Sequence, residues 1–378
     1  MCAGSPMVKS GSRIAISGKI ISDETPFFSS SPTVMIDIGV TSEPVPAVVG
    51  TKTNGNLGPF AFDTPQTSSI FSFDPKIKED NLATSIEDPP PNPITPVALI
   101  LGSNEDLEQA WGVANAKGPR LPLVLVPTTA GTGSEVTPVA IITVGEEEKK
   151  GVSSSIILPD IAILDPELTL GLPAGTTAAT GIDAMVHAIE AYASKSKNNN
   201  PISRMIAIEA LKLLGGSIEK AVFDGSNLEA RGNMLIGAML AGKAFANSPV
   251  AAVHALAYPI GGIYHVSHGL SNSLVLPYVL RFNSVDQKAA KDYSDLAQYV
   301  FPDLDINKGT QAVCAEFIDK IEDLSKRLGL PQKLREVNIP KEACEKMASE
   351  AMKQTRLLVN NPREVNETDA LNIYKAAW

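Results

Sequence analysis

The spacing of hydrophobic residues changes once along the chain, near Pro173. Before this point, short and largely apolar runs alternate with turns rich in Gly, Pro, Ser and Thr. Such runs, bounded by turn residues, are typical of strands buried on both faces of a sheet. Asn104 is suited to cap a helix continuing to Trp111, and the charged segment 146–150 is typical of a polar turn. The pattern predicts four strands, over 97–101, 121–126, 139–144 and 161–164.

After Pro173 the apolar residues recur at helical spacing as far as the end of the chain. Strands followed by helices predict an α/β lobe and then an all-α lobe. A further helix is expected to begin at His268. The other predicted helices cover 176–194, 203–214, 228–246, 250–258, 288–300, 309–328, 341–355 and 367–377.

Residues 1–96 have a different character from the rest. They are rich in Pro, Ser, Thr and Asn, and the cluster DPPPNP at 88–93 is incompatible with a helix or a central strand. A short strand over 34–39 fits the apolar residues there. The Ser-rich, basic segment 1–32 suits either a mobile N-terminus, which we favour, or an organelle transit peptide. We therefore expect an atypical region at 1–96, the rest of an α/β lobe at 97–172 and a helical lobe at 173–378.

Charge and cysteine content narrow the class of protein. The chain has 32 Lys and Arg against 42 Asp and Glu, a net charge of −10, which argues against binding to nucleic acid. Three scattered cysteines fit neither a disulfide framework nor a thiolate zinc site. No apolar run reaches the length of about 18 residues needed for a membrane span. We expect a cytoplasmic homo-oligomer without a membrane or nucleic-acid partner.

The histidines are few and clustered. Asp183 and His187 are four residues apart on one predicted helix, and three of the four histidines fall between His254 and His268. One carboxylate and three imidazoles suit Fe²⁺, Zn²⁺, Co²⁺ or Ni²⁺ better than Ca²⁺ or Mg²⁺. Spacing alone leaves a surface ion pair and a metal site equally open.

A second candidate site is the small-residue loop after the predicted strand 121–126. Its sequence at 128–134, TTAGTGS, offers backbone N–H groups and hydroxyls of the kind that bind phosphates. It matches neither the G-x-G-x-x-G pattern nor the phosphate loop of nucleotide triphosphatases. Taken alone it is equally typical of an ordinary turn.

Five motifs in order resemble the iron-containing alcohol dehydrogenase family over residues 97–378. The C-terminal segment, from NPRE at 361–364 to AAW at 376–378, is also similar to that family. The motifs are PTTAGTGSEVT at 127–137, LPDIAILDPELT at 158–169, ATGIDAMVHAIE at 179–190, VHALAYPIG at 253–261 and SHGLSN at 267–272.

The resemblance implies a dinucleotide-binding α/β lobe, a helical metal lobe, and hydride transfer between an alcohol and NAD or NADP. It implies that Asp183, His187, His254 and His268 are the metal ligands and catalytic residues, with Fe²⁺ first and Zn²⁺ second. It also places a group of residues at the cofactor, with Lys149 or Lys150 near a ribose or phosphate. The cofactor group is Thr128, Thr129, Gly131, Thr132, Gly133, Ser134 and Leu164.

Two departures from the family pattern bear on activity. Tyr258 stands where many members have a histidine credited with proton relay, so His265 is a candidate substitute. The Gly-Gly-Gly-Ser pyrophosphate loop of the family does not occur in the sequence before Pro127. We expect a dehydrogenase acting on an alcohol, aldehyde or ketone. The alternative is a weak or inactive homologue that keeps the metal lobe as a binding module.

Overall fold

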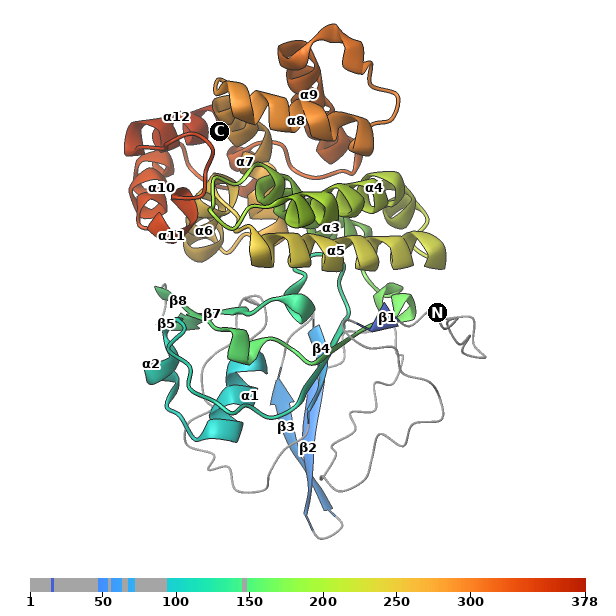
Figure 1. The fold of residues 1–378 in the computed structure, drawn as a ribbon, viewed down its shortest axis with the longest axis vertical. Helices are drawn as coiled ribbons and strands as arrows, with labels where there is room; N and C mark the ends of the chain where they lie inside the picture. Colours follow the sequence, from blue (N-terminus) through green and yellow to red (C-terminus); the bar gives the residue numbers. More distant parts are fainter. Residues whose placement is uncertain (1–14, 17–46, 54–55, 63–66, 72–93, 145–147) are drawn as a thin grey trace. The chain divides into compact units, whose positions relative to one another are not determined.

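The computed structural model describes residues 15–16, 47–53, 56–62, 67–71, 94–144 and 148–378. The strand expected over 34–39 and most of the segment 1–32 lie outside these residues. The chain forms two compact units, which are described separately below (Figure 1). One contains Met1–Thr129 and Ser134–Gly171, and the other contains Ala130–Gly133 and Leu172–Trp378.

The first unit is an α/β unit with three small sheets in its described part. A four-stranded sheet has the order β1-β9-β6-β4, in which β6 and β9 are parallel and the outer strands are antiparallel to them. Its strands are β1 (Ala15–Ile16), β4 (Thr67–Phe71), β6 (Leu123–Pro127) and β9 (Ile161–Leu164). The other sheets are β5-β8-β7 (Gly112–Val113, Glu148–Ser153 and Val139–Val144) and the hairpin of β2 (Ala47–Thr53) and β3 (Asn56–Phe62).

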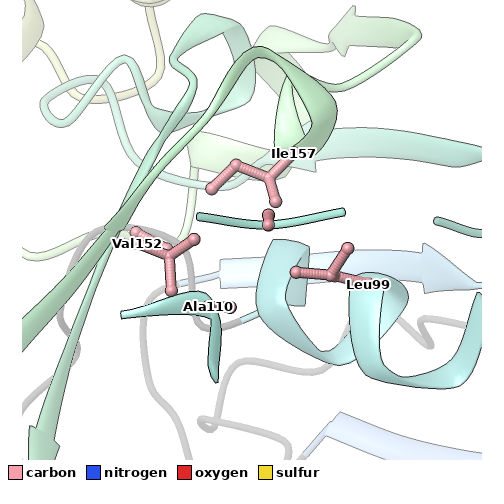
Figure 2. Close-up of a cluster of buried hydrophobic side chains, with 6 residues drawn as sticks. Leu99, Ala110, Val152 and Ile157 are labelled. Atoms are coloured by element: carbon pink, nitrogen blue, oxygen red, sulfur yellow. The ribbon is translucent and has the colours of Figure 1, made fainter. Parts of the chain in front are cut away.

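Three of the four predicted strands are confirmed, as β6, β7 and β9. The strand expected over 97–101 is wrong, because this segment lies in the helix α1 (Ile94–Ser103). Leu99 is fully buried there and belongs to a cluster with Ala110, Val152 and Ile157 (Figure 2). A short apolar run fits a buried helix as well as a strand, and here packing decides for the helix.

Two local predictions near this helix are also corrected. Asn104 follows α1 in a left-handed conformation with φ 58°, and its N–H donates to the carbonyl of Ile100 at 2.9 Å. It therefore ends α1, whereas Asp106 precedes the next helix, α2 (Leu107–Ala110). In the predicted polar turn 146–150, residues 148–150 lie in β8, paired with β7.

The second unit is helical, as expected for the C-terminal part of the chain. The helix α3 packs against α4, α5 and α7, and most of its residues are buried (Figure 1). The helices are α3 (Ala174–Ala193), α4 (Pro201–Phe223), α5 (Leu228–Asn247), α6 (Ala252–Tyr264), α7 (His268–Asn283), α8 (Gln287–Val300), α9 (Thr310–Arg327), α10 (Ala343–Met352), α11 (Thr355–Leu358) and α12 (Glu367–Ala377).

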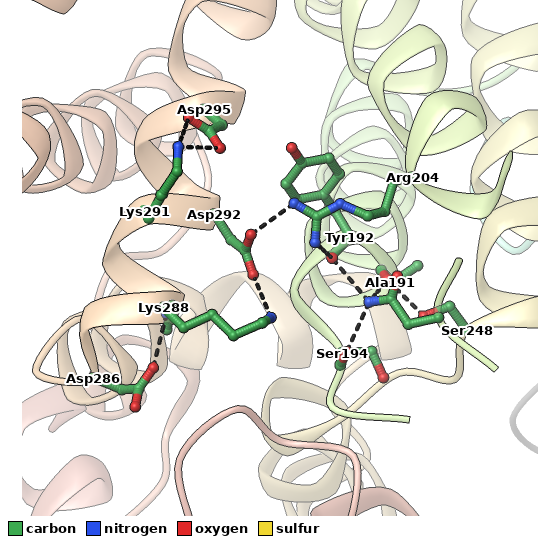
Figure 3. Close-up of polar contacts among 12 residues, drawn as sticks. Ala191, Tyr192, Ser194, Arg204, Ser248, Asp286, Lys288, Lys291, Asp292 and Asp295 are labelled. Atoms are coloured by element: carbon green, nitrogen blue, oxygen red, sulfur yellow. Dashed lines mark hydrogen bonds and ion pairs between the residues drawn. The ribbon is translucent and has the colours of Figure 1, made fainter. Parts of the chain in front are cut away.

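Polar side chains at the start of α4 stabilise this helix end and its contacts with α3 and α8. Asn200 accepts hydrogen bonds from the N–H groups of Ile202 and Ser203, which satisfies donors that a helix leaves free at its start. Arg204 then donates to the buried carboxylate of Asp292 on α8 at 2.7 Å (Figure 3). Arg204 also lies over the ring of Tyr192 on α3, at 3.8 Å from its centroid. These contacts hold α3, α4 and α8 together.

No single helix among the described residues is long and apolar enough to cross a bilayer. The pair α5 and α6 meets the criterion only together, and it is bent by 109°.

Candidate metal centre

Four side chains of the helical unit meet at one point. Asp183 and His187 come from α3, His254 from the first turn of α6, and His268 is the first residue of α7. One potential ligand atom from each lies within 4.8 Å of the others. Asp183 Oδ1 is 4.0 Å from His187 Nε2, 3.9 Å from His254 Nε2 and 3.7 Å from His268 Nε2. The residues singled out in the sequence are thus brought together, and their role as ligands stays a prediction.

Close backbone approach allows the start of α7 to reach α3. A Cβ added at Gly269 would lie 2.5 Å from the carbonyl oxygen of Ala179, so only glycine fits at this crossing. The preceding turn ends α6 at His265, which is left-handed with φ 54°. This geometry brings His268 next to Asp183 on α3, which lies 85 residues earlier in the chain.

Burial sets the charge of the cluster. Burial lowers the pKa of His187 to about 3, and the neighbouring imidazoles add to this, while Asp183 opposes it. Burial alone would raise the pKa of Asp183, but His187, His268, His254 and Asn272 together lower it. At neutral pH the site therefore contains a carboxylate and a neutral His187, whose nitrogen lone pair is available to a cation.

An unpaired nitrogen at the centre fits the binding of a cation. In the part of the chain that the structure describes, four buried side-chain atoms have no hydrogen-bond partner. One of them, His254 Nε2, faces Asp183 Oδ1 at 3.9 Å, at the point where the four side chains meet. Buried polar atoms are nearly always paired in folded proteins, so an unpaired imidazole nitrogen beside a carboxylate fits a bound cation. The donor set of one carboxylate oxygen and imidazole nitrogens fits a divalent transition metal.

Tyr258 and His265 differ in their relation to the centre. The Tyr258 ring centroid is 6.3 Å from that of His268, and burial raises the pKa of its phenol. His265 is exposed at the end of α6. A proton-relay role for His265 stays a prediction.

The expected cofactor residues divide between the two units. Thr128 and Thr129 follow β6, and Ser134 begins a 3₁₀ helix, η2 (Ser134–Val136). Leu164 ends β9, which is parallel to β6, so these two strand ends share one edge of the sheet. Lys150 lies in β8, and the side chain of Lys149 lies outside the described residues.

The middle of the loop packs within the helical unit. A Cβ at Gly131 would lie 2.8 Å from Thr180 Cβ on α3. At Gly133, where φ is 58°, a Cβ would lie 2.6 Å from Gly242 Cα on α5. Thr132 lies between these two close contacts. The cofactor role of the loop is a prediction, but its glycines have a clear structural reason.

Two residues beside the candidate ligands were not predicted from the sequence as site residues. Glu190 contacts His254, and Asn272 Nδ2 donates to Asp183 Oδ1 at 2.6 Å and lies 3.2 Å from His268 Nε2. Both stand one helical turn after a candidate ligand, Glu190 after His187 and Asn272 after His268. Helical spacing from a histidine was the available signal, although many polar residues share it.

Comparison with known proteins identifies the class of protein that this fold and site define. Residues 177–378 match the model of the Fe-containing alcohol dehydrogenase family, C-terminal, and residues 97–166 match that of iron-containing alcohol dehydrogenase. The chain is similar to long-chain-alcohol dehydrogenase 1 of Geobacillus thermodenitrificans, with 39% identity over 75% of this chain and 70% of that one. It is 38% identical to 1,3-propanediol dehydrogenase of Citrobacter freundii, over 72% and 69% of the two chains.

Solved structures give the same result. The structure of a 1,3-propanediol oxidoreductase matches with a TM-score of 0.71 and 36% identity, over 75% of this chain and 73% of the other. Sulfoacetaldehyde reductase from Bifidobacterium kashiwanohense in complex with NAD+ matches with a TM-score of 0.65 and 30% identity, at the same coverage. The chain belongs to the iron-containing alcohol dehydrogenase family, and it is an alcohol oxidoreductase with the α/β and all-α lobes of that family.

Proposed function

We propose that this protein transfers a hydride reversibly between an alcohol and NAD or NADP, giving the aldehyde or ketone. The proposal places a divalent metal, Fe²⁺ before Zn²⁺, on Asp183, His187, His254 and His268. The observation that carries it is the convergence of these four side chains, with one ligand atom each within 4.8 Å. The unpaired Nε2 of His254, which faces Asp183 Oδ1, supports it.

The first chemical requirement of this reaction is a bound divalent cation, and the charges of the candidate ligands suit it. Bound metal would supply a Lewis acid for the substrate oxygen. Asp183 contributes a negative charge, because its pKa is lowered, and His187 is neutral, because burial lowers its pKa to about 3. Together they bind a cation without a proton first having to leave His187.

The cofactor part of the proposal rests on the loop 128–134 and on Leu164. These residues follow the carboxyl ends of two parallel strands, where α/β sheets commonly bind nucleotides. The related sulfoacetaldehyde reductase, solved in complex with NAD+, supports a nicotinamide cofactor. A weak or inactive homologue, the alternative expected from the sequence, gains no support from relatives that are themselves named as dehydrogenases.

Domain limits at 96 and 172, a cytoplasmic location and self-association are further proposals. Self-association is supported by apolar side chains exposed on one helix: Ile202, Met205 and Phe223 on α4 are 63–67% exposed. Size-exclusion chromatography with light scattering of the full chain tests it.

The experiment for the main proposal is reconstitution of the metal-free full chain with Fe²⁺ or Zn²⁺. Reduction of NAD⁺ and NADP⁺ is then followed with a series of primary alcohols and diols. We expect reduction that depends on both metal and alcohol. If neither metal restores reduction of either cofactor by any alcohol, although the protein binds metal, the proposed reaction is wrong.

A further inference from the structure

Glu190 joins two neighbouring residues of α6 to α3. Its side chain is buried, with 5% of its surface exposed. Oε1 accepts a hydrogen bond from the Val253 N–H at 2.7 Å, and Oε2 lies 2.7 Å from His254 Nδ1. One carboxylate therefore holds both the backbone at the start of α6 and the ring of a candidate metal ligand.

The backbone contact replaces a missing cap. The residue before α6 is Ala251, whose side chain has no acceptor for the free N–H groups of the first turn. Glu190 supplies that acceptor from α3. This contact alone would be a structural role and would leave the chemistry of His254 unaffected.

The side-chain contact has a chemical consequence. A carboxylate only accepts hydrogen bonds, so the short contact assigns the proton of His254 to Nδ1. In the tautomer with this proton, the lone pair of the ring lies on Nε2. This nitrogen is the buried atom without a partner, 3.9 Å from Asp183 Oδ1.

We propose that Glu190 is a positioning residue that selects the His254 tautomer and orients its Nε2 toward the metal. The inference rests on the proposed metal site and assigns a residue to it that lies outside the four ligands. Carboxylates behind metal-binding histidines commonly have this effect, and their loss typically costs about 10- to 100-fold in metal affinity.

The test replaces Glu190 by Gln in the full chain, which keeps the size of the side chain. A glutamine oxygen can accept from either Val253 or His254, and its NH₂ group then faces the other. If the oxygen keeps the Val253 contact, the NH₂ group favours a proton on His254 Nε2, where it would block the metal. Co²⁺ and Zn²⁺ affinities, measured by chelator competition, should fall about 10- to 100-fold.

Asp292→Asn provides the matched control. Asp292 is also a buried carboxylate with two partners, Arg204 at 2.7 Å and Lys288 at 2.9 Å, but it lies on α8 outside the metal centre (Figure 3). This variant should lose stability and keep the metal affinity of the parent chain. The Co²⁺ absorption spectrum should change in the Glu190 variant only.

The ring nitrogens provide a second measurement that needs no variant at Glu190. The chain has four histidines, so ¹⁵N-histidine spectra of the metal-free protein contain few signals, and His254→Asn identifies one set. We expect His254 to be protonated at Nδ1. A proton on His254 Nε2 in the parent chain overturns this inference alone, and so does parental metal affinity in a Glu190→Gln variant whose His254 proton has moved to Nε2. If the parent chain binds no metal, the proposed function itself fails.

Discussion

At the scale of single residues, His268 is the most exposed of the four candidate ligands, with 31% of its side chain exposed. Replacing it by Ala leaves packing largely intact but removes one of four donors. We expect His268→Ala to lose most bound metal and all metal-dependent activity. Elemental analysis of the purified variant measures this. His265→Ala, an exposed histidine three residues earlier, is the matched control and should retain metal. Unchanged metal content in His268→Ala would refute the ligand assignment.

The variant Tyr258→Phe tests whether the phenol of Tyr258 takes part in proton transfer. Burial raises the pKa of its phenol, so the group stays protonated at neutral pH and is a poor base. Tyr258→Phe should therefore change turnover less than about tenfold, below the usual contribution of a general acid or base. Steady-state kinetics over a pH range measures the effect. A loss of several orders of magnitude would identify the phenol as the relay.

The buried His187 makes the metal-free protein sensitive to acid. Its pKa is about 3 in the folded chain against 6.5 for an ordinary histidine, so between these values the unfolded state binds more protons. Stability contributed by the neutral ring is complete above pH 6.5 and is lost as pH falls toward 3, by at most about 1.4 kcal/mol per pH unit. Denaturant titrations of the metal-free chain at several pH values measure the slope. His187→Gln should flatten it, and an equal slope in both proteins would contradict the argument.

At the scale of elements, the loop 130–133 depends on two close contacts with helices. Gly133→Ala places a side chain on a left-handed backbone and 2.6 Å from Gly242 Cα, which costs roughly 1–2 kcal/mol for the backbone alone. We expect lower stability and weaker binding of NAD or NADP, measured by thermal unfolding and calorimetry. Gly216→Ala, an open position within α4, is the control and should stabilise by about 0.5–1 kcal/mol. An unaffected Gly133 variant would show that the loop can move away from α5.

At the scale of the whole molecule, we expect cofactor affinity to depend on a pyrophosphate loop in the α/β lobe. The Gly-Gly-Gly-Ser sequence that the family resemblance implies for this loop does not occur before Pro127. Without the Gly-Gly-Gly-Ser loop, several hydrogen bonds to pyrophosphate are lost, each worth about 1.5–3 kcal/mol. Losing two of them weakens dinucleotide affinity about a hundredfold or more. We expect weak cofactor binding and slow turnover, while the helical unit folds and binds metal.

Calorimetric titration of the full chain with NAD⁺ and NADP⁺ measures this. Insertion of a strand–loop–helix unit carrying Gly-Gly-Gly-Ser before Asn104 should restore tight binding. A dissociation constant in the low micromolar range for the unmodified chain would contradict the prediction. It would mean that residues 1–103 contain a phosphate site of another kind.

The sequence by itself determined the features that depend on local repetition. Helical periodicity after Pro173 predicted most long helices to within a few residues. The helices α4 and α6 extend several residues further than predicted, and for α7 only the start was predicted. The motifs predicted the family, and the spacing of Asp183 and His187 placed both on one helix face. Each of these signals is contained in a short stretch of sequence, so it does not depend on tertiary packing.

Only the tertiary structure decided features that depend on distant neighbours. Packing of Leu99 against Val152 and Ile157 made a helix of a run that also fits a strand. The contact between Glu190 and His254 joins positions 64 residues apart, and Asn272 reaches Asp183 across 89. The sequence singled out Gly131 and Gly133 as part of a candidate phosphate loop, but only the structure shows that α3 and α5 lie against them. The physical reason is that burial and hydrogen-bond pairing depend on which helices pack against each other. Hydrophobic periodicity indicates only that each helix has an apolar face to bury.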